Sequence, residues 1–186
     1  MLPMTDGRPE YSGSAAWAAL WIARELTVHG DSIAGSTAAR RSASWIDALP
    51  PQDRDAPEMR AFKVEFLEQA GAYALAREID QKLVNSDTGN VDYKGMLAAL
   101  AAETGDSATA EQLDRWLAGL PPARASWGAS FYRARLASVR GRQLDAVAFV
   151  RESLEKGAWP TWLHLDPVLH RLAERADYIA LTKPRG

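Results

Sequence analysis

The sequence predicts an all-α fold, a right-handed α-solenoid of about four helical hairpins that ends in a C-terminal capping helix. A glycine followed five residues later by a small residue occurs four times, starting at Gly30, Gly71, Gly105 and Gly141, with spacings of 41, 34 and 36 residues. A period in the thirties is typical of helical repeat arrays. Amphipathic stretches precede and follow each glycine, and no segment alternates apolar and polar residues as a strand would.

The four glycines are expected to end the first helix of each hairpin. A glycine costs roughly 1 kcal/mol in a helix interior, whereas it adopts the left-handed conformation of a helix C-cap without steric cost. Seven residues before the glycines lie Ala23, Val64, Ala98 and Ala134, which are small or slim side chains. Such residues suit positions where two helices approach closely.

The element boundaries follow from the polar, Pro- and Gly-containing segments between the hairpins. We expect a flexible leader at 1–13 and hairpins at 14–50, 57–88, 90–122 and 123–157. The proline-rich segment 49–57 reads as a loop, which accounts for the longer first interval. Residues 158–186 are expected to form a loop and a capping helix. Asp166 is placed to cap that helix and Pro167 to begin it, where a missing N–H costs nothing.

The hairpin pattern resembles the tetratricopeptide repeat family over 14–157. The small residue of the family's second helix is present as Ala76, Ala110 and Ala146, and is replaced by Gly35 in the first hairpin. The C-terminal part, with its "YRARLA", "LHLDP" and "LTKPRG" segments, is similar to the end of tetratricopeptide regions in large bacterial signalling proteins, where such regions follow a kinase, winged-helix or TolB-like domain. The resemblance implies a region that binds other proteins.

Composition excludes several classes of function. A net charge of −2 argues against nucleic acid as the main partner, since phosphate binding needs clustered Lys and Arg. The chain has no cysteine, which excludes disulfides, thiolate catalysis and Cys-based zinc sites. No apolar run approaches the roughly 20 residues that cross a bilayer, so no membrane insertion is expected. The first residues lack a secretory signal, and a cytoplasmic location is expected.

The resemblance also implies a concave groove lined by the first helices of successive hairpins. Offsets from the glycines place Arg24, Glu65, Glu68, Phe131 and Arg135 in that groove, where arginines could hold a carboxylate or phosphate of a bound peptide. In that role, Arg135→Glu would weaken partner binding without lowering the melting temperature. The alternative is that these side chains merely lie on solvated helix faces.

A non-catalytic module that binds a peptide or helix of another protein is therefore the expected function, with no enzyme activity, cofactor or metal. One alternative is a regulatory or sensor region of a larger bacterial signalling protein. The other is a small metal-dependent enzyme that uses His164, Asp166 and His170, whose side chains are suitable zinc ligands. Helix capping by Asp166 competes with that interpretation.

The seven tryptophans are a further unusual feature of the composition. Trp21 and Trp116 lie in apolar stripes and are expected in the core. Trp159 and Trp162 flank Pro160, and one of them is expected to face solvent. Tryptophan can anchor an interface, since binding hot spots are rich in it, but packing between helices in the core is its commoner use.

Overall fold

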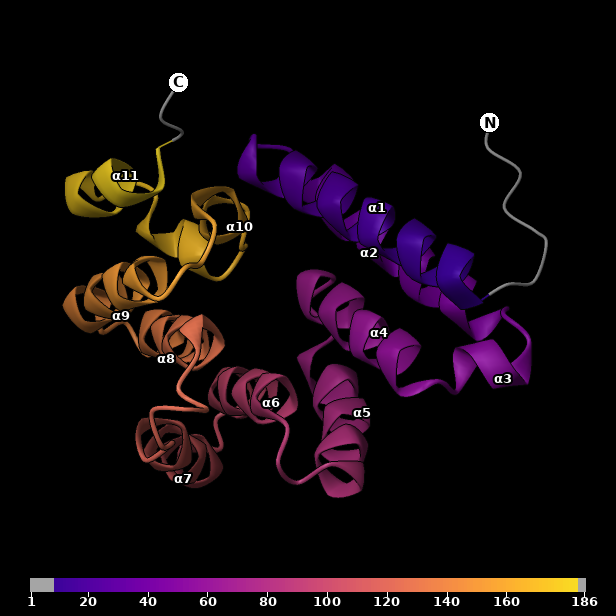
Figure 1. The fold of residues 1–186 in the computed structure, drawn as a ribbon. Coiled ribbons are helices and arrows are strands. Elements are labelled where there is room, and N and C mark those ends of the chain that lie inside the picture. The colour runs from indigo at the N-terminus through magenta and orange to yellow at the C-terminus, as the bar shows by residue number, and fades with distance from the viewer. Residues whose placement is uncertain (1–8, 184–186) are drawn as a thin grey trace. The chain divides into compact units, whose positions relative to one another are not determined.

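The computed structural model describes residues 9–183, with side chains from residue 15 onward. Residues 1–8 of the expected leader and the last three residues of the "LTKPRG" segment lie outside the described residues. Within that range the chain forms helices and turns and no strand (Figure 1), which confirms the predicted all-α class. Helix α1 (Pro9–Val28) begins inside the segment expected to be a leader.

The chain divides into two compact units, residues 1–83 and 84–186, with the division inside α5 (Tyr73–Ser86). The first unit also contains α1, α2 (Ser32–Asp47), α3 (Pro51–Arg54) and α4 (Pro57–Gln69). Helix α1 packs against α2 and α4, and α2 packs against α4. The short α3 lies where a loop is predicted, because Pro51 at its first position loses no hydrogen bond there.

The second unit contains α6 (Val91–Glu103), α7 (Ser107–Ala118), α8 (Trp127–Val139) and α9 (Gln143–Glu155). Helix α6 packs against α7 and α8, α7 against α8, and α8 against α9. Residues from α6, α7 and α8 form much of the apolar core, together with the end of α5: Val84, Leu97, Ala98, Ala101, Ala110, Leu113 and Leu136.

The four repeated glycines adopt the predicted left-handed conformation, with φ of 97° at Gly30, 75° at Gly71, 82° at Gly105 and 70° at Gly141. After each glycine the next N–H bonds back to the carbonyl five residues earlier, as from Asp106 to Ala101 at 2.8 Å. The glycine N–H bonds to the carbonyl three residues earlier, so each end is a Schellman cap. Gly157, which the repeat pattern did not include, ends α9 in the same way.

Small residues at the corresponding positions of the four hairpins are buried. Ala23, Val64, Ala98 and Ala134 are at most 1% exposed, and Ala76, Ala110 and Ala146 are fully buried. In the first hairpin a Cβ added at Gly35 would lie 2.1 Å from Thr27 Oγ1 and 2.8 Å from the Ala23 carbonyl oxygen. Gly35 replaces alanine there because α1 and α2 leave no room for a methyl group.

The C-terminal segment forms three short helices, α10 (Pro160–His164), η1 (Leu169–Leu172) and α11 (Ala176–Thr182), instead of a loop and one capping helix. The Oδ1 of Asp166 accepts the N–H groups of Val168 at 3.0 Å and Leu169 at 2.9 Å, as the predicted cap would. Pro167 does not begin the helix, because it lies in the turn before η1 starts at Leu169. The backbone becomes extended at Arg175 (ψ 123°), which interrupts the helix. Tyr178 is 2% exposed and donates its hydroxyl to the Leu163 carbonyl at 2.8 Å.

Candidate functional site

The three predicted groove residues of the first unit lie on α1 and α4. Arg24 on α1 is 3% exposed and forms an ion pair with Glu65 on α4, with 2.6 Å between Arg24 Nη2 and Glu65 Oε2. Glu68, one turn from Glu65 on α4, is 7% exposed. A neighbouring polar contact joins Gln69 Nε2 to Thr27 Oγ1 at 3.0 Å. In the first unit these polar side chains hold α1 and α4 together.

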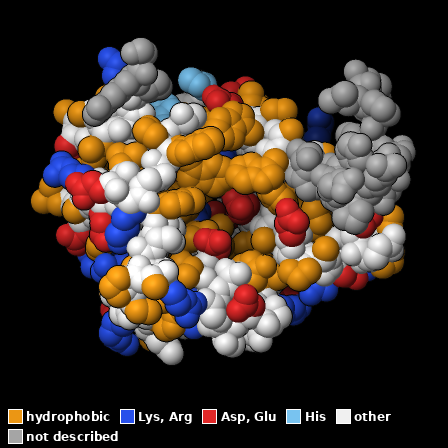
Figure 2. Space-filling model, in the orientation of Figure 1, with side chains coloured by type: hydrophobic (Ala, Val, Ile, Leu, Met, Phe, Trp, Pro, Cys, Tyr) orange, Lys and Arg blue, Asp and Glu red, His pale blue; other side chains and the backbone are white. Residues whose placement is uncertain are grey.

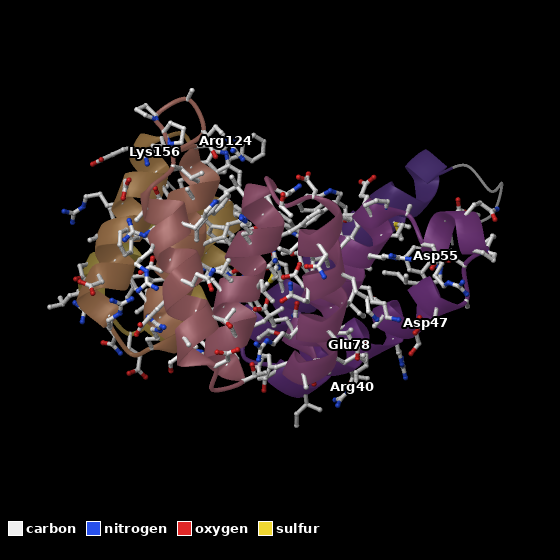
Figure 3. The ribbon with its side chains drawn as sticks, turned by 90° about the horizontal axis from the view of Figure 1, so that it is seen from below. Arg40, Asp47, Asp55, Glu78, Arg124 and Lys156 are labelled. Carbon is white, nitrogen blue, oxygen red and sulfur yellow. The ribbon has the colours of Figure 1, made fainter. Side chains whose placement is uncertain are left out.

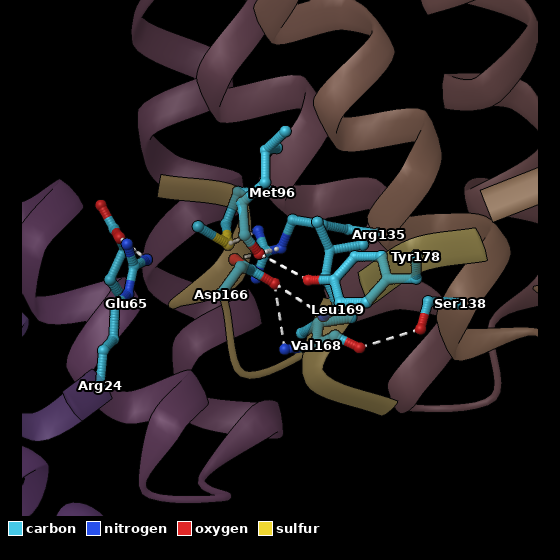
Figure 4. Close-up of polar contacts among 10 residues, drawn as sticks. Arg24, Glu65, Met96, Arg135, Ser138, Asp166, Val168, Leu169 and Tyr178 are labelled. Carbon is cyan, nitrogen blue, oxygen red and sulfur yellow. Dashed lines mark hydrogen bonds and ion pairs between the residues drawn. The ribbon is translucent and has the colours of Figure 1, made fainter. Parts of the chain in front are cut away.

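Arg135, the predicted anchor of the second unit, is the largest fully buried side chain of the described residues, at 1% exposure. Its Nε lies 3.3 Å from Oδ2 of Asp166, which is itself fully buried (Figure 4). Its Nη1 donates to the sulfur of Met96 at 3.2 Å. Ser138, one turn later on α8, donates to the Val168 carbonyl at 2.9 Å. The same face of α8 therefore holds the C-terminal segment through buried polar contacts.

Phe131 lies beside Arg135 in an aromatic cluster at the start of α8. Its ring centroid is 5.0 Å from that of Tyr132 and 6.1 Å from that of Trp127, and the Arg135 guanidinium carbon is 5.6 Å from it. Phe131 is 3% exposed, so it packs in the interior of the second unit. Because Phe131 and Arg135 are both buried, the structure does not favour a direct contact of either side chain with a peptide, and that contact stays a prediction.

Of the three residues of the His164, Asp166 and His170 motif, Asp166 has a defined structural role. The Asp166 carboxylate is occupied by Arg135 and by two backbone N–H groups. Over the described part of the chain, no group of three His, Asp or Glu side chains is arranged to hold a metal ion. Capping and ion pairing thus account for Asp166.

Three large apolar side chains of α1 are exposed. Trp17 is 44% exposed, Trp21 37% and Ile22 57%, and Figure 2 shows hydrophobic side chains at the surface over this helix. The prediction that Trp21 belongs to the core is wrong. The reason is that α1 is apolar on nearly every side, so its composition could not show which face is covered. That same excess of apolar residues was the available signal for an exposed surface.

The other tryptophans differ in environment. Trp159 is 78% exposed, which confirms that one of the Trp159 and Trp162 pair faces solvent. Trp116 is half-buried and lies under Lys94, whose Nζ is 3.9 Å from the ring centroid. Cation–π contact with lysine is a weak stabilising interaction at such a site.

Charged side chains on the outer helix faces mostly pair with near neighbours. Figure 3 shows Asp47, Asp55 and Glu78 on the outside of the first unit. Asp47 pairs with Lys63, Asp55 with Arg54 at 3.0 Å, and Glu78 with Lys82 at 2.8 Å. The nearby Lys82 ammonium lowers the pKa of Glu78. Exposed pairs of this kind contribute little to stability.

In the second unit, the pKa of Asp92 is shifted in the opposite direction to that of Glu78. Asp92, in the first turn of α6, lies against the start of α8, where a Cβ at Gly128 would be 3.5 Å from its Oδ1. Although Asp92 stays partly exposed, desolvation on the side that packs against α8 raises its pKa, and a hydrogen bond from the Tyr132 hydroxyl opposes the shift. The charged form of Asp92 is therefore disfavoured in the folded protein.

Because the folded-state pKa of Asp92 is raised above 3.8, its contribution to stability is present at low pH and is lost as pH rises through the folded pKa. We expect the free energy of unfolding of Asp92→Asn, relative to wild type, to increase from pH 4 to pH 7, as measured by urea denaturation. Glu78→Gln should show the opposite slope, because the pKa of Glu78 is lowered. A flat or falling Asp92→Asn difference would mean that the α6 N-terminus stabilises the carboxylate more than desolvation disfavours it.

No helix in the described residues is both long and apolar enough to span a bilayer. No family model matches the chain, and no curated protein or solved structure that was compared with it matches either.

Proposed function

We propose that this chain is a non-catalytic protein–protein interaction module that binds a peptide or helix of another protein. In this proposal its hairpins form a right-handed, tetratricopeptide-like α-solenoid. The support is local: Schellman caps end the first helices at the repeated glycines, small residues lie at equivalent close contacts, and α6 packs against both α7 and α8. Arrays of this kind use extended surfaces for binding.

The observation that carries the proposal is the exposed apolar surface of α1. Trp17, Trp21 and Ile22 lie within two helical turns and are each more than a third exposed. Tryptophan is enriched among the residues that dominate binding energy, and contiguous exposed apolar patches mark interaction sites. A helix laid into such a surface would contact residues one turn apart on α1.

The test is site-specific photo-crosslinking in lysate of the native organism. A photoreactive phenylalanine replaces Ile22 in one variant and the exposed Glu111 of α7 in a control. We expect a defined crosslinked protein from position 22 that is absent from position 111 and is displaced by excess wild-type protein. The same set of crosslinks from both positions, or none from position 22, would contradict an interaction surface on α1.

A further inference from the structure

The exposed tryptophans of α1 lie next to α4, and contacts define how the two helices are aligned. The ring centroids of Trp17 and Phe62 are 5.8 Å apart in an edge-to-face arrangement, Arg24 pairs with Glu65, and Gln69 bonds to Thr27. Residue numbers thus rise in the same direction along both helices, so α1 and α4 run parallel. Phe62 is 6% exposed, so the half-exposed Trp17 packs against a buried ring.

Acidic side chains lie at both ends of this apolar strip. Glu58 on α4 is exposed and is one turn before Phe62, which places it at the Trp17 end. Glu25 on α1 is one turn after Trp21, its side chain is 38% exposed, and its nearest ionic partner is His29, 3.0 Å away. Glu65 lies between them but is neutralised by the buried Arg24. The net charge of the strip is therefore negative at its two ends.

The distance between the carboxylates of Glu58 and Glu25 favours a partner with two positive charges at a matching distance. Phe62 lies level with Trp17, so Glu58, four residues before Phe62, is about twelve residues from Glu25 along the helix axis, which at 1.5 Å per residue is roughly 18 Å. A bound helix lying along α1 would meet carboxylates at two places about three turns apart, with apolar contacts between them. Resting on the proposed interaction function, we propose that this strip (Trp17, Trp21 and Ile22 with Glu25 and Glu58) binds a basic amphipathic helix. Its Lys or Arg residues lie eleven or twelve positions apart and bracket aliphatic anchors.

The size of the strip favours a short segment over a second copy of this chain. Two tryptophans and one isoleucine at these exposures offer on the order of 300 Å² of apolar surface, given 150–250 Å² for a whole aromatic side chain. A stable dimer needs about 800 Å² on each partner. A peptide helix needs fewer anchors, and opposite charges at its ends fix its register.

The test compares two synthetic 18-residue peptides by fluorescence anisotropy with the full-length protein. Both carry leucines at i, i+3, i+4 and i+7; one carries lysines at the flanking positions and the other glutamates. We expect the basic peptide to bind roughly tenfold more tightly at low salt. The preference should shrink in 1 M NaCl, where the Debye length is about 3 Å.

Two matched double variants test whether Glu25 and Glu58 cause the preference for the basic peptide. Glu25→Lys with Glu58→Lys should abolish or reverse the preference, whereas Glu111→Lys with Glu155→Lys, which changes the net charge equally at exposed positions of α7 and α9, should retain it. Equal affinity for both peptides, or equal loss in both variants, would overturn the basic-helix inference. If neither peptide binds but position 22 crosslinks a protein, this inference fails and the interaction function stands. If the crosslink is also absent, both fail.

Discussion

Arg135→Ala is expected to lower the free energy of unfolding by about 3–5 kcal/mol, the usual cost of removing one partner from a buried ion pair. The reason is that Asp166 is fully buried and Arg135 is the cation beside its Oδ2. Without the guanidinium, the carboxylate loses its charge partner while it still caps the turn before η1. Urea denaturation followed by circular dichroism measures the change.

A double-mutant cycle separates the ion pair from the loss of volume. Asp166→Asn keeps an Oδ1 acceptor for the two N–H groups, and Arg135→Met keeps much of the buried side-chain volume. The combined variant should be clearly more stable than Arg135→Met alone, because no unpaired charge stays buried. Arg175→Ala, which removes a surface pair with Asp177, is the control and should cost much less.

The same experiment decides between the two roles considered for Arg135. A residue that only contacts a peptide in a groove can be replaced without loss of stability, whereas a residue that holds the C-terminal segment cannot. Unchanged unfolding of Arg135→Ala would restore the groove role, and a large loss would assign Arg135 to the attachment of the C-terminal segment.

Gly95→Ala should destabilise the second unit by roughly 1–3 kcal/mol, although alanine is the better helix former. A Cβ added at Gly95 would lie 2.1 Å from Cγ of Tyr132 and 2.6 Å from its Cβ. These are atoms near the backbone of α8 that cannot move without shifting the helix. Thermal and urea unfolding measure the loss.

Gly128→Ala is the matched control for this substitution. Gly128 is also helical, but its added Cβ meets Asp92 and Ser126 at an ordinary distance of 3.5 Å. We expect this variant to be as stable as wild type or up to about 1 kcal/mol more stable. If Gly95→Ala behaves like Gly128→Ala, then α6 and α8 are not held at the close spacing seen here. Tyr132→Ala, which removes the Cγ that the added methyl group meets, should relieve part of the cost of Gly95→Ala, which a double-mutant cycle would show.

Features that depend on a few consecutive residues were predicted from sequence. The glycine caps at Gly30, Gly71, Gly105 and Gly141 and the capping role of Asp166 are local, because the partners in their hydrogen bonds lie within five residues. The all-α class follows from the same local periodicity. The buried alanines Ala110 and Ala146 were also predicted, since their positions repeat with the hairpins.

The environment of each helix face was decided only by tertiary structure. Arginine is usually a surface residue, yet Arg135 and Arg24 are buried. Each is paired with a carboxylate far away in sequence that compensates its charge, Arg135 with Asp166 and Arg24 with Glu65. Tryptophan is usually a core residue, yet Trp21 is 37% exposed, because the helices of the first unit that pack on α1 leave part of its ring uncovered. Periodicity shows that a helix has an apolar face, and the packing of helices distant in sequence decides which face stays exposed.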